Sequence, residues 1–217
     1  MAETIQLWNG DADGSTVEDT WLNGGSRNTN YSTATTMSVG MRASNARRLF
    51  IGFYPSEVLP AYDDVEWTQA DLVLLTLGFP PPASAGCTLH WMNRTAALTA
   101  QMTWNDYKTG FFPWTTGGGD WDATPTTTGT IPASPAAAFR IDIDAFLQES
   151  LDPGTRMPML VKLTTESGTN NWTIAASEYG SGATDPPQRP YLELIGEKRL
   201  DLGTQFGWLN PISGNQG

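Results

Sequence analysis

The fold of this chain is decided by stretches such as Phe139-Arg140-Ile141-Asp142-Ile143-Asp144, in which apolar and polar side chains alternate at every position. Successive side chains of a β-strand point to opposite faces, so this alternation is typical of a strand with one face in a core and one in solvent. Met37–Met41 and Met157–Leu163 follow the same period of two. Leu72–Leu77 is more uniformly apolar and indicates a central strand that is covered more fully. Together these stretches predict an all-β fold, an antiparallel β-sandwich.

Turn and loop sequences separate the alternating stretches. Gly supplies positive φ and Pro removes a ladder donor, so clusters of both interrupt strands. One short helix is expected over Asp144–Leu151, with Asp144 as its N-cap and Pro153-Gly154 as its end. The segment Trp114–Pro135 is rich in Thr, Gly and Pro, and we expect it to be an excursion loop, a common place for functional residues. The clearest turn clusters are Asn23-Gly24-Gly25-Ser26, Pro80-Pro81-Pro82, Thr116–Asp120 and Gly180-Ser181-Gly182.

A chain of 217 residues is long enough for one substantial core, and we expect a single domain with an extended arm at each end. The expected boundaries are an N-terminal arm over residues 1–15, a jelly-roll domain over 16–197 and a C-terminal arm over 198–217. Both arms carry apolar residues, which predicts docking on a neighbouring subunit in an assembly. Folding of the tail back onto its own domain stays open. The apolar arm residues are Leu7, Trp8, Phe206, Trp208 and Leu209.

The charge balance narrows the range of partners. Lys and Arg (12) are outnumbered by Asp and Glu (23), and a net charge of -11 argues against nucleic acid and against a polybasic membrane anchor. Met1-Ala2-Glu3-Thr4 lacks the basic and apolar regions of a secretory signal, so we expect synthesis in a cytoplasm. Cys87 is the single cysteine and is expected to be a buried thiol, with no disulfide framework.

The sequence offers little for catalysis. His90 is the only histidine, it lies on the polar side of an alternating stretch, and no nucleophile motif accompanies it. Asp142 and Asp144 share one face of a predicted strand about 7 Å apart, but solvated carboxylates on strands are far commoner than a glycosidase pair. We therefore expect a protein that is not an enzyme.

A metal is equally weakly supported. Asp11-Ala12-Asp13-Gly14 is similar to the start of a calcium loop, but Glu18 and Asp19 come too early for its terminal ligand. No metal ligands are assigned and no cofactor is expected, with a structural calcium ion as the one possibility left open.

Nine tryptophans are many for this length, and at least some are expected at the surface. Trp114 and Trp121 flank the glycine run of the expected loop. Exposed, they offer flat faces for a sugar ring, with Asp120 accepting hydrogen bonds from hydroxyls and Trp172 as a further candidate. The favoured alternative is that they anchor the loop to its own domain or to a neighbouring subunit. Trp104 is expected to plug one end of the sandwich.

Short motifs recur along most of the chain, from about Thr16 to about Glu197. They are Asp19-Thr20-Trp21-Leu22, Asn30-Tyr31, Met37–Gly40, Arg47–Phe53, Ala70–Leu74, Met102–Asn105, Phe139–Ile143, Ala176-Ser177-Glu178 and Arg189–Leu194. In this order they resemble a DNRLRE-type domain, a jelly-roll module related to a family of carbohydrate-binding modules. The chain departs from that family after Arg48, because Gly52 and Tyr54 flank Phe53 where the family has an arginine and an aspartate. Arg189 is expected to pair with Glu178 or Asp19 where the closing loop meets the sheet.

The resemblance implies binding, display and assembly rather than catalysis. Together with the apolar residues of the two arms, it favours a non-enzymatic structural component of a virus particle: a bacteriophage capsid decoration, head-fibre or tail protein. Such a protein is made in the host cytoplasm, resides in the virion and contacts other virion proteins or its own copies. The alternative is a carbohydrate-binding module or adhesin that stacks Trp114, Trp121 and Trp172 on polysaccharide.

Overall fold

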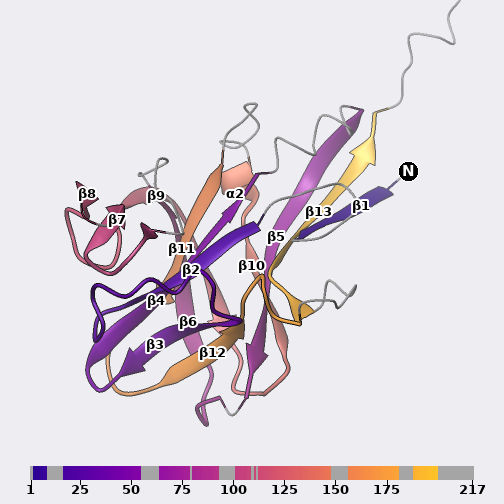
Figure 1. The fold of residues 1–217 in the computed structure, drawn as a ribbon. Helices are drawn as coiled ribbons and strands as arrows, with labels where there is room; N and C mark the ends of the chain where they lie inside the picture. Colours follow the sequence, from indigo (N-terminus) through magenta and orange to yellow (C-terminus); the bar gives the residue numbers. More distant parts are fainter. Residues whose placement is uncertain are drawn as a thin grey trace, which may run out of the picture.

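The computed structural model in Figure 1 describes residues 2–8, 17–54, 64–78, 80–92, 101–108, 110, 112–147, 156–180 and 188–199. This part of the chain is an antiparallel β-sandwich with little helix, as the alternating stretches predict. The strands are β1 (Ala2–Trp8), β2 (Val17–Asn23), β3 (Thr36–Arg42), β4 (Asn45–Phe53), β5 (Val65–Leu77), β6 (Ala85–Met92), β7 (Asp106–Lys108), β8 (Phe112–Pro113), β9 (Trp121–Ile131), β10 (Ala138–Asp142), β11 (Met157–Leu163), β12 (Asn171–Ala175) and β13 (Tyr191–Lys198), with one short helix, α2 (Asp144–Leu147).

One large sheet forms both layers. Its strand order is β1-β13-β5-β12-β3-β4-β11-β6-β9, with β10 also pairing with β5 and β2 with β4, while β7 and β8 make a separate small hairpin. Strand β5 joins the layers, because most of it pairs with β13 and β10 while its end at Thr76 and Leu77 pairs with β12. Figure 1 shows β1, β13, β5 and β10 on one side and β2, β4, β11 and β6 on the other.

The register explains which residues are buried. Opposed residues of paired strands share a face, and Leu7, Leu192, Leu72 and Ile141 form one such row across β1, β13, β5 and β10. All four belong to the main hydrophobic core between the layers. Cys87 also lies in this core, where burial raises the pKa of its thiol to about 11. The expectation of a buried cysteine is confirmed.

The prediction that Trp114–Pro135 is an excursion loop is wrong, because its residues Trp121–Ile131 form strand β9. This strand pairs antiparallel with β6 from Ala85↔Ile131 to His90↔Thr126, with an irregularity before Met92↔Trp121. Threonine is a good strand residue, and the backbone ladder on β6 outweighs the scattered Gly and Pro that predicted a loop.

The described part of the expected N-terminal arm, residues 1–15, is also a strand. All seven residues of β1 pair with β13, and Leu7 is 1% exposed in the main core. Leu7 is therefore not available for docking on a neighbour. Trp8 is half-buried, and the guanidinium of Arg189 lies 5.6 Å from its ring centroid. Phe206, Trp208 and Leu209 lie outside the described residues.

The helix begins where the sequence predicts, but its cap differs. Asp142, not Asp144, accepts a hydrogen bond from the first helical amide, from Asp144 N to Asp142 Oδ1 at 2.9 Å. The Asp144 carboxylate instead accepts the backbone N–H of Ala70 on β5. Both carboxylates thus hold the β10–α2 connection, and the part of the predicted helix beyond residue 147 lies outside the described residues.

Candidate functional site

The outer face of one layer is covered by the segment that runs from Gln101 to Trp121. Outward-facing residues of β2, β4, β6 and β11 form a second hydrophobic cluster with Met102 and Trp114 of that segment. Trp114 is 5% exposed and its indole Nε1 donates a hydrogen bond to the carbonyl of Thr103 at 2.9 Å. Burial of these side chains fastens the segment to the sheet. The strand residues of this cluster are Leu22, Phe50, Met92 and Leu160.

Arg48 of β4 fixes this covering segment to the sheet. Its guanidinium lies over two indole rings, with Cζ 4.9 Å from the ring centroid of Trp104 and 5.0 Å from that of Trp121. Nε and Nη2 each donate to Glu166 at 2.7 Å, and Nη1 donates to the carbonyl of Gly118 at 3.0 Å. This guanidinium joins β4 to two loops that are distant in sequence.

Gly118 is needed at this point because of both its conformation and its packing. Its φ is +85°, and a Cβ built there meets Trp104 at 2.7 Å and Arg48 Nη1 at 2.8 Å. The run Gly117-Gly118-Gly119 was the one signal in the sequence that something packs closely here. Glu166, which completes the arrangement, carried no such signal. Trp104 belongs to this outer cluster rather than to a plug between the layers.

The residues expected to contact a sugar are mostly used by the fold. Trp172 is 1% exposed and its indole donates to the carbonyl of Pro132 at 3.1 Å. Asp120 is buried and accepts the backbone N–H groups of Thr115 and Thr116 at 2.9 and 2.8 Å.

The exposed-tryptophan interpretation is therefore wrong for Trp114 and Trp172, and at Trp114 the anchoring alternative describes the contacts. Trp121 stays half-exposed, with Lys162 Nζ 5.7 Å from its ring centroid and the ring of His90 at 5.4 Å.

His90 does lie on the outward side of its strand, as its place in the alternation predicts, but that side is covered. Burial lowers the pKa of its imidazole, and the charge of Lys162 lowers it further. Its Nδ1 lies 3.3 Å from the hydroxyl of Thr126. A buried neutral imidazole packed under an indole fits a structural group.

Asp19 is the most strongly perturbed acid in the described part of the chain. Burial, followed by the charge of Glu178, raises the pKa of its carboxyl to about 7, although the backbone N–H of Ser177 donates to it at 2.6 Å. Arg189, which was expected to pair with this group or with Glu178, donates to the carbonyls of Tyr179 and Gly180, each at 3.1 Å.

Among the described residues, no group of three or more His, Cys, Asp or Glu side chains is placed to hold a metal ion. The sequence Asp11–Gly14, where a calcium loop was considered, lies outside those residues. No helix in the described ranges is long and apolar enough to cross a membrane.

The outer face of the other layer carries a band of polar side chains. Gln6 Nε2 donates to Glu193 at 3.0 Å, and Gln69 Nε2 donates to Asp71 at 2.8 Å. Arg140 joins the two acids, with a hydrogen bond to Glu193 and Nη1 at 3.5 Å from Asp71 Oδ2. The hydrogen bond from Arg140 lowers the pKa of Glu193. This band crosses β1, β13, β5 and β10, and its arginine side chain is 49% exposed.

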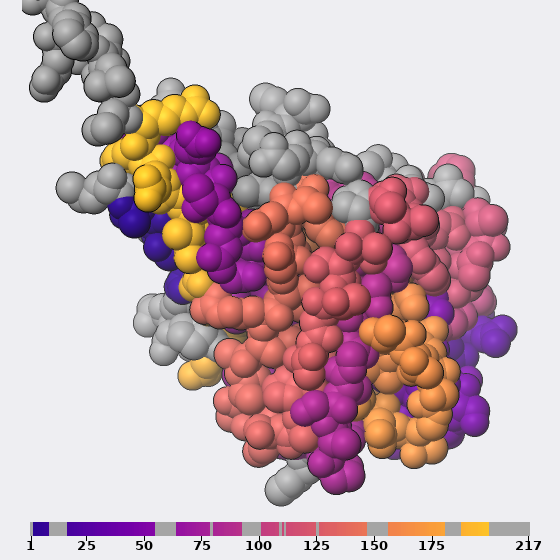
Figure 2. Space-filling view, turned by 180° about the vertical axis from the view of Figure 1, so that it is seen from behind, coloured from indigo at the N-terminus to yellow at the C-terminus, as the bar shows by residue number. Residues whose placement is uncertain are grey.

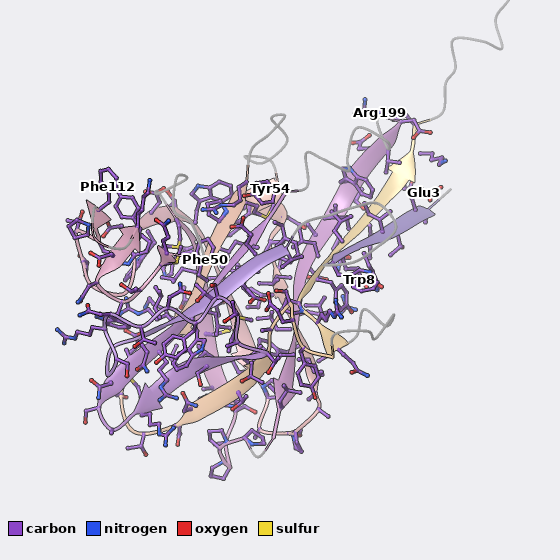
Figure 3. All side chains as sticks on the ribbon, viewed as in Figure 1. Glu3, Trp8, Phe50, Tyr54, Phe112 and Arg199 are labelled. Carbon is purple, nitrogen blue, oxygen red and sulfur yellow. The ribbon has the colours of Figure 1, made fainter. Side chains whose placement is uncertain are left out.

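At one end of this layer, β1, β13 and the first part of β5 extend past the sandwich. Ala2 lies opposite Glu197, and Glu3 Oε1 lies 3.4 Å from Lys198 Nζ. Figures 2 and 3 show the projecting strands, with Glu3 and Arg199 at the same tip. Strand β1 stands at the end of the strand order, so in the described part of the chain it pairs with β13 alone.

Comparison with known proteins adds no assignment: no protein-family model and no curated protein matches this chain.

Proposed function

We propose that this protein is a non-enzymatic structural component of a virus particle, such as a bacteriophage capsid decoration, head-fibre or tail protein. In this role the sandwich is a rigid jelly-roll body, and the protein attaches to the particle through the projecting tip and the chain that flanks it. Its partners are other virion proteins or further copies of itself. No cofactor is required for that role.

The observation that carries the proposal is the geometry of the tip. Ala2, at the start of the outermost strand β1, lies opposite Glu197 on β13, and the described residues end shortly after that pair, at Arg199. The sequence after Arg199 contains Phe206, Trp208 and Leu209, which are side chains suited to burial in an interface. An edge strand has unpaired backbone groups that a neighbouring chain can extend. In this proposal the edge of β1, which pairs with β13 alone in the described part of the chain, supplies an open ladder, and these apolar side chains supply anchors.

A second observation supports a role without catalysis. In the described part of the chain, the aromatic and charged residues that stand out in the sequence are engaged in holding the fold. Trp114 and Trp172 are buried, Asp120 braces a turn, and Arg48 fastens a cover.

The test is sedimentation with particles from the biological source. Full-length protein is expected to sediment with them, and a variant ending at Arg199 is expected to stay in the supernatant while keeping the same thermal unfolding profile. Phe112→Ala, an exposed change away from the tip, serves as the matched control and is expected to sediment normally. A full-length protein that remains soluble and monomeric, unaffected by the truncation, contradicts the proposal.

A carbohydrate-binding module or adhesin is the second candidate function. The observation that favours it is an open polar groove between Arg42, the proline run 80–82 and the segment Thr169–Thr173. A glycan array probed with the wild type and with Arg42→Ala checks this candidate. Signals absent for all glycans, or unchanged in the variant, remove it for this groove. Trp121→Ala on the same array tests the half-exposed tryptophan separately.

A further inference from the structure

The groove lies at the end of the sandwich where β3 ends and β12 begins, at the bottom of Figure 1. Its volume is about 460 Å³ and three chain segments line it. One is the end of β3 at Arg42, the second is Pro80-Pro81-Pro82 after β5, and the third is Thr169–Asn171 with Thr173 at the start of β12. The lining contains a cation, amides, hydroxyls and proline rings, and no carboxylate.

This groove is a positively charged place on an acidic protein. Arg42 is exposed, and the structure gives its guanidinium no ion pair or hydrogen bond within the described ranges. Arg47 lies on the neighbouring strand β4, opposite Gly40 of β3. Burial lowers the pKa of Arg47, and the charge of Arg42 lowers it further. The whole chain has a net charge of -11, yet no acid is among the described residues that line the groove. An anion placed there meets an unpaired arginine fork.

Two buried polar atoms without a partner lie near this groove. Asn171 Nδ2 donates to Ser38 Oγ at 3.3 Å, and Arg47 Nη1 donates to the same hydroxyl at 3.2 Å. This leaves Asn171 Oδ1 and Arg47 Nε buried without a hydrogen-bond partner. Both atoms are shielded from solvent, so they belong to the wall that supports the groove and not to its ligand-facing surface.

The backbone holds this amide in place. Asn170 O accepts the N–H of Met41 at 2.7 Å, and a Cβ on Gly40, whose φ is +131°, lies only 2.3 Å from the same carbonyl oxygen. The loop therefore sits directly on the glycine of β3. Such a preformed arrangement lowers the cost of ordering the site when a ligand binds.

The proline run gives the groove its apolar part. Three consecutive prolines have fixed φ values and present CH-rich rings, which suit the apolar face of a pyranose. Arginine matches carboxylate and sulfate groups in a bidentate manner, and amides and threonine hydroxyls bond sugar hydroxyls.

We propose that this groove binds a saccharide that carries an oxyanion, with Arg42 pairing with the anionic group, the hydroxyls of Thr169 and Thr173 bonding sugar hydroxyls and Pro80–Pro82 contacting the ring. A carboxylate and a sulfate ester supply the same chemistry, so the shared feature is an oxyanion on a sugar. The inference names the ligand class of the second candidate function. It does not depend on particle assembly.

The test is titration calorimetry of the full chain at low ionic strength with three oligosaccharides of matched length. They are an oligogalacturonate, a sulfated galactan without carboxylates and a neutral galactan, with inorganic sulfate as a separate probe. Binding of at least one charged oligosaccharide is expected, at least tenfold tighter than the neutral one and weakened by added salt. The probe that binds tells which oxyanion is recognised.

Substitutions in the groove test whether the oligosaccharide binds there. Arg42→Ala is expected to weaken binding at least tenfold, Arg42→Lys less, and Asn171→Asp to abolish it by placing a negative charge in the groove. Arg27→Ala changes another exposed arginine and is the matched control, expected to bind as the wild type. Thermal unfolding of each variant checks that it folds.

Equal binding of charged and neutral oligosaccharides, no binding at millimolar concentration, or wild-type binding by Arg42→Ala overturns the inference. Inorganic sulfate that binds as tightly as the oligosaccharides overturns the saccharide part. Sedimentation of Arg42→Ala with particles reports on the proposed assembly independently, because Arg42 lies on the groove and not at the β1–β13 tip.

Discussion

The two outer faces of the sandwich differ in what lies on them. The face of β2, β4, β6 and β11 is apolar and carries the segment Gln101–Trp121, fastened by Trp114 and by the stacked guanidinium of Arg48. The face of β1, β13, β5 and β10 is polar and carries a hydrogen-bonded band around Arg140. The aromatic-rich segment is thus a cover for an apolar sheet face. In the described part of the chain, the polar band, the projecting tip and the groove at Arg42 are surfaces open to partners.

Because of this difference, we expect side chains of the two faces to contribute unequally to the free energy of unfolding. Side chains in the cover remove a large apolar area from water, so their loss costs both transfer free energy and cavity formation. Side chains of the polar band exchange water for partners at the surface and contribute little net free energy. Three substitutions on the two faces and one pH dependence from a group between the layers follow, in order of the expected loss of stability.

The largest effect is expected for Trp114→Ala. Removing a buried indole from the second cluster is expected to lower the free energy of unfolding by about 3–5 kcal/mol, as is usual for Trp→Ala in a core. Chemical denaturation measures it. Phe112→Ala is the matched control, because Phe112 lies two residues away and is 47% exposed, and a loss below about 1 kcal/mol is expected there. Equal losses in the two variants contradict the description of a fastened cover.

Arg48→Ala is expected to cost about 2–4 kcal/mol. The variant loses a bidentate ion pair with Glu166, a hydrogen bond to Gly118 and two stacked rings, and leaves the carboxylate without its partner. Amide hydrogen exchange at Gly117–Gly119 is expected to accelerate. Arg48→Lys keeps the charge but not the fork, and is expected to fall between the wild type and the alanine variant. Unchanged exchange in Arg48→Ala removes the proposed fastening role.

A pH effect of intermediate size is expected from Asp19, which lies on β2 between the layers. Its pKa is about 7 in the folded protein and about 3.8 unfolded, so folding favours the protonated acid and stability falls as the pH rises toward 7. Between pH 6 and pH 8 the loss is about 1.4 kcal/mol, because one pKa unit corresponds to about that free energy.

Asp19→Asn is expected to remove this dependence, since an amide oxygen still accepts the N–H of Ser177 but does not ionise. Denaturation curves at pH 6, 7 and 8 measure it. Asp142→Asn, at an exposed acid, is the control and should keep the slope of the wild type. A wild-type slope retained in Asp19→Asn shows that another group is responsible.

The smallest effect is expected for Arg140→Ala in the polar band. Its side chain is about half exposed, so loss of its contacts with Glu193 and Asp71 should cost about 1 kcal/mol or less. The loss should shrink as the pH falls through the lowered pKa of Glu193, because the protonated acid no longer forms an ion pair with Arg140. Thermal unfolding from pH 7 down to a pH below that pKa checks this. A cost as large as that of Trp114→Ala would remove the contrast between the two faces.

Local patterns explain how much of the fold could be predicted. The alternation in Met37–Met41, Phe139–Ile143 and Met157–Leu163 places each in a strand, because the period of two follows from strand geometry alone. The same reasoning failed for Trp121–Ile131, whose threonines show no apolar alternation and whose strand depends on pairing with β6. It also failed for Leu7. This residue lies on β1, which pairs with β13 nearly 190 residues later, and the local sequence does not show that pairing.

The candidate sites were less predictable than the strands. Arg48 and Glu166 are 118 residues apart, and nothing in either local sequence indicates the other. Arg42, Pro80–Pro82 and Asn171 come from three separate segments that meet only at one end of the sandwich. Trp114 and Trp172 stand out in the sequence, but their sequence neighbours do not tell whether an indole faces solvent or a core, and both are buried.

The amino-acid sequence alone therefore determines that this chain forms an antiparallel sandwich, with strands whose buried faces follow from periodicity, and with one buried thiol. Tertiary structure alone decides which outer face is covered, where both ends of the domain lie and which arginine is left unpaired in a groove. The physical reason is how far apart along the chain the interacting residues lie. Strand periodicity depends on neighbours one and two residues away, whereas burial, ion pairing and pKa shifts depend on groups that only the folded sheet brings together.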